Sequence, residues 1–337
     1  MAGPILVALV TLVVGLVACA EAGFSFRDPD HVAALYVVEV GVAVALLVLL
    51  DVFIRTRRAT GRRWPSRSDM GAVRRERWTA KRLAMVGGAI VAFYATYLAY
   101  RNLKASVPLL RPELFDADLA DVDRAMFFGT DPAAILHDLL GTGMAAHVLS
   151  TLYVAFIVFL PLSLALALVF AERIAVSLFY ATAMSINWII GAASYFILPA
   201  LGPIYADPGS FSALPHTEVT HLQELLMTDR VGFLADAANG TPQAIAAFAS
   251  LHIAMSVTTL VMAYMLGLGK WVKRSLWVWN AITVIATVYL GWHYVLDDIA
   301  GIGLGIAAIY LAIWLTGFDP REARSPARRQ TVPSPAT

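Results

Sequence analysis

The chain has 337 residues, of which 59% are hydrophobic and only 15% are charged, and its mean hydropathy is +0.70. Soluble domains typically contain about 45–50% apolar and about 25% charged residues, so this composition excludes an ordinary soluble protein. The formal net charge of +1 lacks the basic surplus of a nucleic-acid-binding protein, and the single cysteine, Cys19, allows no internal disulfide.

A helix that spans a bilayer needs about 20 mostly apolar residues. Eight runs of this kind are present, at 4–20, 31–54, 83–100, 145–170, 174–198, 248–268, 275–290 and 299–316. The first run ends in a sequence that resembles a lipoprotein cleavage box, but no positive charge precedes it as in a signal peptide, so we read it as a span. We therefore predict an all-α, polytopic membrane helical bundle with about eight transmembrane helices.

The positions of Lys and Arg predict the orientation, because short basic loops stay cytoplasmic. Segment 55–82 carries eleven Lys and Arg residues against Asp69 and Glu76. If this segment is cytoplasmic, 19 of the 25 Lys and Arg residues lie on that side. The other six are Arg27, Arg101, Lys104, Arg111, Arg124 and Arg230. We predict a plasma-membrane protein with both termini in the cytoplasm.

The predicted spans divide the chain into three parts. Residues 1–82 hold two N-terminal transmembrane helices and the basic loop, 83–316 form a membrane core, and 317–337 form a disordered cytoplasmic tail rich in Pro, Arg and Ser. Two outer segments, 101–144 and 199–247, are too long to be simple connectors. We expect these two segments to cover a site at the extracytoplasmic face.

Polar residues that can support catalysis gather where several predicted spans reach this outer edge. His293 and Asp297 are four residues apart, so on a helix the carboxylate can orient and charge the imidazole as a nucleophile requires. His252 comes from another span and can act as a general acid. Ser250 lies near a helix start, where free backbone N–H groups favour a phosphate. These groups predict phosphoryl transfer through a phosphohistidine. The aromatic residues expected to contact the substrate are Tyr205, Trp292 and Tyr294.

Two other interpretations use the same residues differently. A zinc site could be built from His252, His293 and Asp297, with His216 or His221 as a fourth ligand. The spacing of the last two histidines is not the H-E-x-x-H of metalloproteases. Alternatively, the chain could be a lipid transporter or scaffold without catalysis, although the two histidines and the carboxylate of the predicted site favour an enzyme.

The same residues resemble a known family. Ser250-Leu251-His252 resembles the P-S-x-H second motif of the type 2 phosphatidic acid phosphatase superfamily, and His293 to Asp297 resembles its H-x-x-x-D third motif. Residues 286–294 and 123–132 resemble the branch that contains fungal inositol phosphorylceramide synthase. The resemblance covers roughly residues 95–316 and implies the six-helix core of that superfamily.

The resemblance implies that His293 attacks phosphorus, that Asp297 orients it, and that His252 protonates the leaving group. It implies no metal and no other cofactor. The implied reaction moves a phosphoryl or phospho-headgroup from a lipid phosphate or phospholipid donor to a lipid or polyol acceptor. A lipid-phosphate phosphatase of the polyprenyl or phosphatidic acid type is the alternative, because water can discharge the same intermediate.

The sequence departs from the superfamily motifs in three places, and two of these departures remove cations. Ala249 stands where the second motif has proline, Thr287 stands where the third motif has an arginine, and the first motif, K-x6-R-P, is present only as Gly202-Pro203. A buried phosphate needs compensating positive charge. We therefore expect phosphate to be bound by Ser250, Arg101, Lys104 and Arg230.

Overall fold

The computed structural model describes residues 2–28 and 31–321, and every regular element in these ranges is a helix. In chain order these are α1 (Ala2–Glu21), α2 (Val32–Thr60), α3 (Arg67–Arg77), α4 (Ala80–Leu110), α5 (Asp116–Met126), α6 (Pro132–Leu140), α7 (Met144–Phe170), α8 (Ile174–Ile197), α9 (Pro203–Ala206), the 3-10 helix η2 (Pro208–Phe211), α10 (Glu218–Ala235), α11 (Leu251–Met265), α12 (Lys270–Tyr289) and α13 (Val295–Thr316). The predicted all-α class is confirmed.

Six of the described helices are long and apolar enough to cross a membrane: α1, Ala34–Thr60 within α2, α4, α7, α8 and α13. The predicted spans 248–268 and 275–290 form α11 and α12, but neither is among these six. α11 has only 15 residues, about 22 Å at about 1.5 Å per residue, whereas the hydrocarbon core is about 30 Å thick. α12 begins with a cluster of cations. The polytopic membrane bundle is thus confirmed, with six helices of spanning character rather than eight.

One face of α2 has no protein cover. Leu35, Val38, Val42, Leu46 and Leu49 are all more than half exposed, and their spacing of three or four residues places them along one stripe of the helix. A long exposed apolar stripe fits contact with lipid rather than with water.

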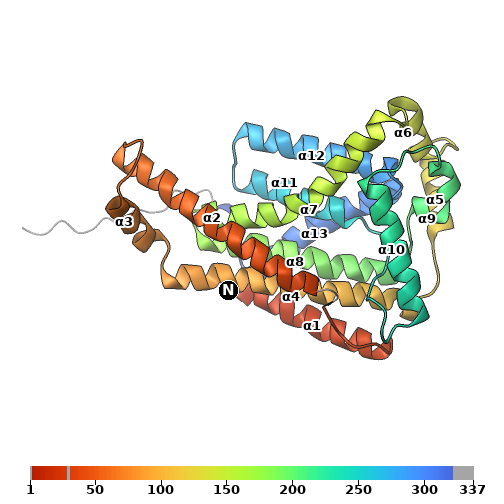
Figure 1. Cartoon of the computed structure of the whole chain (residues 1–337), viewed down its shortest axis with the longest axis horizontal. Coiled ribbons are helices and arrows are strands. Elements are labelled where there is room, and N and C mark those ends of the chain that lie inside the picture. Colours follow the sequence, from red (N-terminus) through yellow and green to blue (C-terminus); the bar gives the residue numbers. More distant parts are fainter. Residues whose placement is uncertain (1, 29–30, 322–337) are drawn as a thin grey trace, which may run out of the picture.

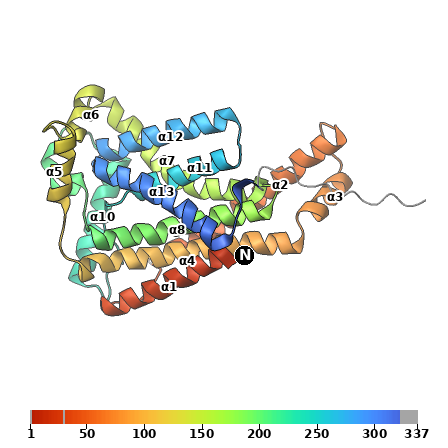
Figure 2. The same ribbon diagram turned by 180° about the vertical axis from the view of Figure 1, so that it is seen from behind.

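The two ends of the bundle differ in what they carry. Helices α5, α6, α9 and α10 gather at one end, and α3 lies at the opposite end (Figure 1). Seen from behind, α13 runs between α8 and the α11–α12 pair, and α1 lies along α4 (Figure 2). Of the predicted disordered tail, residues 322–337 lie outside the described residues, while Phe318 stacks on Phe179 with ring centroids 4.3 Å apart.

Close contact between α11 and α13 brings the starts of the two helices together. A side chain at Gly301 would collide with the carbonyl of Ser250, and one at Gly305 would collide with the carbonyl of Ala254. Thr258 Oγ1 also donates a hydrogen bond to the Gly305 carbonyl at 3.2 Å. Small residues four apart let two helix backbones approach closely. The starts of α11 and α13 therefore lie side by side.

Candidate active site

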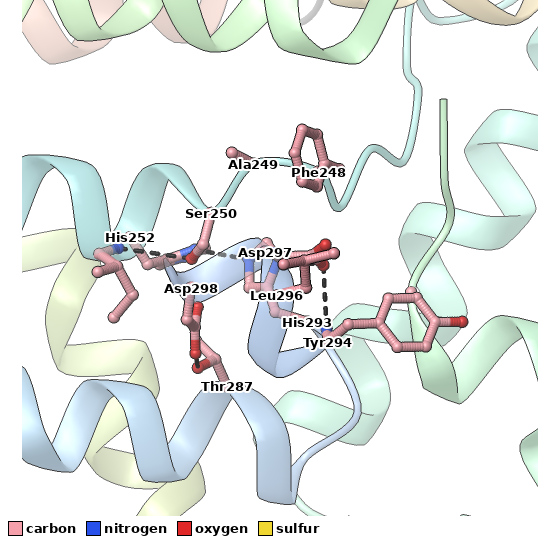
Figure 3. A network of polar contacts seen from close by, with 12 residues as sticks. Phe248, Ala249, Ser250, His252, Thr287, His293, Tyr294, Leu296, Asp297 and Asp298 are labelled. Atoms are coloured by element: carbon pink, nitrogen blue, oxygen red, sulfur yellow. Dashed lines mark hydrogen bonds and ion pairs between the residues drawn. The ribbon is translucent and has the colours of Figure 1, made fainter. Parts of the chain in front are cut away.

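The structure brings His252, His293 and Asp297 together at the paired starts of α11 and α13 (Figure 3). His293 Nδ1 lies 3.4 Å from Asp297 Oδ2, and His293 Nε2 lies 3.4 Å from His252 Nδ1. One nitrogen of the His293 ring thus faces the carboxylate and the other faces the second imidazole.

Asp297 is held by the backbone around it. Its Oδ2 accepts a hydrogen bond from the Tyr294 N–H at 2.9 Å, and its backbone carbonyl accepts one from the Ser250 N–H at 3.0 Å. The side chain is fully buried, and its Oδ1 has no hydrogen-bond partner among the described residues. A buried carboxylate with an unused oxygen beside an imidazole can stabilise positive charge on that ring.

Aromatic rings surround the two histidines. The His252 ring lies 4.9 Å from Tyr153 and 4.7 Å from Phe156, between ring centroids. Trp292 stacks on Tyr153 at 5.3 Å. Burial in these surroundings lowers the pKa of His293 to about 3, and the nearby Lys104 ammonium acts in the same direction. The His293 ring is therefore neutral near pH 7, as a nucleophile requires.

The three cations expected to bind phosphate differ in their surroundings. Lys104 lies over the Tyr195 ring at 5.7 Å and makes no ion pair with a described carboxylate. Arg101, one turn earlier on α4, reaches Gln243 Oε1 at 3.5 Å. Arg230 on α10 has a buried Nε without a hydrogen-bond partner and interacts electrostatically with Asp116. Of these three cations, Lys104 is the one whose charge acts on the His293 ring.

Thr287, at the position where the third motif of the superfamily has an arginine, is hydrogen-bonded to a buried carboxylate. Thr287 Oγ1 donates a hydrogen bond to Asp298 Oδ2 at 2.8 Å (Figure 3). Asp298 Oδ1 has no hydrogen-bond partner among the described residues, and the residue is only 2% exposed. Ser250, the fourth group expected to bind phosphate, caps α11 by accepting a hydrogen bond from the Ile253 N–H at 3.5 Å.

Of the residues expected to contact substrate, Trp292 and Tyr294 are buried and Tyr205 is partly exposed. The Tyr294 hydroxyl donates to Asp116 Oδ1 at 3.2 Å. The Tyr205 hydroxyl donates to the Gln223 carbonyl at 3.2 Å, and the Tyr205 ring meets Trp292 edge-on at 6.2 Å. The cavity that reaches His293 has a volume of about 10 Å³, room for about one water molecule. Substrate binding therefore requires side chains to move.

Two carboxylates of α5 hold the site segments in place, a role that sequence reasoning missed. Asp123 accepts hydrogen bonds from the N–H groups of Val295 at 2.7 Å and Leu296 at 3.1 Å, and so caps α13. Asp116 accepts them from Leu201 and Gly202. The signal that could have revealed this role is the spacing of seven residues between Asp116 and Asp123, which puts both carboxylates on one helix face.

We expect Asp123→Ala to lower both stability and activity. It leaves two partly buried N–H groups at the start of α13 without acceptors, which costs about 1–3 kcal/mol, and it frees the helix turn that carries Asp297. Thermal unfolding and turnover would measure the two effects. Asp121→Ala is the matched control, because this exposed carboxylate on the same helix pairs only with Arg124. Equal effects of the two substitutions would contradict the capping role.

The structure places the two histidines considered as a fourth zinc ligand away from His293. His216 and His221 line a surface hollow of about 570 Å³ together with His147 and Glu224. Within residues 2–28 and 31–321, no group of three or more His, Cys, Asp or Glu side chains is arranged to hold a metal ion.

Comparison with known families gives a match that contains this site. The chain matches the PAP2 superfamily over residues 117–311, more than half of its length. The matched segment runs from α5 to α13 and includes Asp123, His252, His293 and Asp297. No curated protein and no solved structure matches the chain.

Proposed function

The chain belongs to the PAP2 superfamily, and we propose that it moves a phosphoryl or phospho-headgroup from a donor lipid to an acceptor through a phosphohistidine on His293. Membership supports a membrane-embedded phosphatase or phosphotransferase acting on lipid phosphates in general. The position of His293, 3.4 Å from both Asp297 and His252, carries the more specific proposal.

Three side chains carry out the bond-making and proton-transfer steps of the proposed chemistry. His293 Nε2 attacks phosphorus, the bond from phosphorus to the ester oxygen breaks, and that oxygen takes a proton from His252. An acceptor hydroxyl then attacks phosphorus and gives its proton to His252, and the P–N bond breaks. Asp297 stabilises the positive ring between the two steps. Because a phosphoryl group does not fit within 3.4 Å, the two imidazoles separate when substrate binds.

One feature of the sequence supports transfer to an alcohol rather than hydrolysis. Thr287 replaces the arginine of the third motif, and residues 286–294 resemble the branch containing inositol phosphorylceramide synthase. The donor is a lipid phosphate or phospholipid and the acceptor a lipid or polyol in this proposal. A lipid-phosphate phosphatase with the same intermediate is the second candidate.

Product analysis separates transfer from hydrolysis. The purified protein is incubated with a lipid phosphate labelled at phosphorus, with and without lipid and polyol alcohols. We expect the label to appear in a new phosphoester only when an acceptor is present, with slow release of inorganic phosphate otherwise. Fast release of phosphate that no acceptor changes would favour the phosphatase.

Removal of the Lys104 charge tests the phosphate-binding proposal. We expect Lys104→Met to lower kcat/KM by about a hundredfold or more, because an isolated cation near a developing phosphate charge contributes several kcal/mol in a dry site, and Lys104→Arg to retain more activity. Arg101→Ala should also lower turnover. Arg124→Ala, which removes an exposed cation paired with Asp121, serves as the control. Near-normal activity of Lys104→Met would remove this residue from the site.

The proposal includes an orientation in the plasma membrane. The termini and the basic end would lie in the cytoplasm, and His293 would open to the extracytoplasmic leaflet. The distribution of charge supports this orientation: segment 55–82 holds eleven of the 25 Lys and Arg residues, and α3 lies at the end of the bundle opposite α5, α6 and α9 (Figure 1).

A further inference from the structure

The end of the bundle opposite the candidate active site carries a dense basic surface, formed by the end of α2, the loop after it, α3 and the start of α4 (Figure 1). We define the basic surface by its eight exposed cations: Arg57, Arg58, Arg62, Arg63, Arg67, Arg74, Arg75 and Lys81. Within 55–82 only Asp69 and Glu76 are negative. The surface therefore has a large positive surplus.

Three further cations of this segment bind acceptors of the protein itself. Arg55 and Arg77 donate to the buried Asp51 at 2.7 and 2.6 Å. Arg82 donates to the Ala171 carbonyl at the end of α7, at 2.8 Å. Arg77 also donates to the carbonyls of Val169 and Ala171. These bonds fix α3 to the core, so the basic surface has a defined shape.

The exposed cations have few protein partners. Only Arg62 pairs with a carboxylate of the described residues, Asp69 at 3.4 Å. Like charges held close together repel one another unless counter-charges neutralise them. Within residues 2–28 and 31–321 the protein supplies only Asp69 as a counter-charge, so the other exposed cations are available to an external anion.

A cavity in the basic surface has the chemistry of an anion site. Its volume is about 290 Å³, and it is lined by Ile54, Arg57, Arg58, Gly61 and Arg62. Guanidinium groups match the geometry of phosphate oxygens and bind them with two parallel hydrogen bonds. The isoleucine adds an apolar wall, which fits the glycerol and acyl part of a lipid better than a free ion.

The depth of the cavity in the membrane identifies the partner. Ala34–Thr60 is a candidate span, so a cavity at its end lies at the level of the lipid headgroups. Trp64 is 75% exposed and its ring lies 6.1 Å from that of Phe53. Exposed tryptophan is typical of the membrane–water interface. Basic residues next to a span attract anionic lipids.

We propose that the basic surface binds anionic phospholipids, with Arg57, Arg58 and Arg62 around the phosphate of one headgroup. The remaining exposed cations of the surface contact the same leaflet. This binding is independent of the proposed catalysis, because the cavity lies at the other end of the bundle from His293 (Figure 1).

Quenching of Trp64 fluorescence by lipids tests this proposal. The full chain is reconstituted in phosphatidylcholine vesicles with a small fraction of brominated phosphatidylglycerol or brominated phosphatidylcholine, and the signal of Trp64→Phe is subtracted. We expect stronger quenching by the anionic lipid, weakened at high salt. Combined Arg57→Gln, Arg58→Gln and Arg62→Gln should lower this lipid preference about fivefold or more, whereas the three Arg→Lys changes should keep most of it.

A matched variant separates the effect of the cavity on lipid preference from the effect of total positive charge. Lys270→Gln, Lys273→Gln and Arg274→Gln together remove three cations at the start of α12, outside the cavity, and should leave the preference unchanged. Size-exclusion profiles and thermal unfolding check that all variants are folded. Equal quenching by both lipids in the wild-type protein, or an equal loss in the α12 variant, would overturn the proposal. Neither result depends on catalytic activity.

Discussion

His293→Gln is expected to abolish turnover, with a loss of about ten-thousand-fold or more, because removing the nucleophile of a covalent mechanism leaves only substrate binding and electrostatic stabilisation. Glutamine has a similar size but no nitrogen lone pair that can attack phosphorus. The direct measurement is trapping of a phosphorylated enzyme with a lipid phosphate labelled at phosphorus. The trapped species should be labile in acid, as a P–N bond is, and absent from the variant.

Two controls belong to the His293 experiment. His147→Gln changes an exposed histidine and should keep both turnover and the trapped species. Vanadate, which mimics five-coordinate phosphorus on a nucleophilic imidazole, should inhibit the wild-type protein, and chelators should not. Turnover of His293→Gln within tenfold of wild type would exclude the phosphohistidine, and the reverse inhibitor pattern would support the zinc alternative.

His252→Gln is expected to slow the reaction of substrates with basic leaving groups far more than that of substrates with weakly basic leaving groups. A general acid typically contributes about a hundredfold to ten-thousand-fold, so phosphorylation of His293 by an alkyl lipid phosphate should slow by this factor. With p-nitrophenyl phosphate, whose leaving group departs without a proton, the first step should be nearly unchanged. The variant should then show a burst of p-nitrophenol and accumulate phosphoenzyme, because no base activates the second nucleophile.

The two substrates distinguish a proton donor from a structural residue. The His252 ring packs between Tyr153 and Phe156, so a packing defect would slow both substrates equally. Equal losses, without a burst, would therefore contradict the role of general acid. Thermal unfolding of the variant reports any such defect separately.

Local sequence pattern predicted the parts of this protein that depend on near neighbours. The long apolar runs predicted the helical membrane bundle, since every backbone polar group must be satisfied within the helix in lipid. The spacing of His293 and Asp297 predicted a pair, and the structure has them 3.4 Å apart. Of the eight predicted spans, α11 and α12 are not among the six candidate spans of the described residues, because α11 has only 15 residues and α12 begins with a cluster of cations.

Local sequence pattern could not predict the contact between the two histidines of the candidate site. His252 is 41 residues from His293, and the prediction that they meet depended on counting spans, not on any contact visible in the sequence. The close approach of α11 and α13 at Gly301 explains why they meet. The sequence does not show which helical glycines pack closely against another helix. Gly301 meets the backbone at the start of α11, whereas Gly303 on the same helix has no atom of a neighbour within 4 Å of the position that a Cβ would take.

The sequence by itself determined the membrane class, the basic segment 55–82 and the residue types of the candidate site, because composition, charge and short spacings are local properties. Only the tertiary structure decided that Asp123 caps a helix 172 residues away and that Lys104 lies over the Tyr195 ring without a carboxylate partner among the described residues. These contacts join segments distant in the chain, and they follow from how the helices pack, which no local pattern encodes.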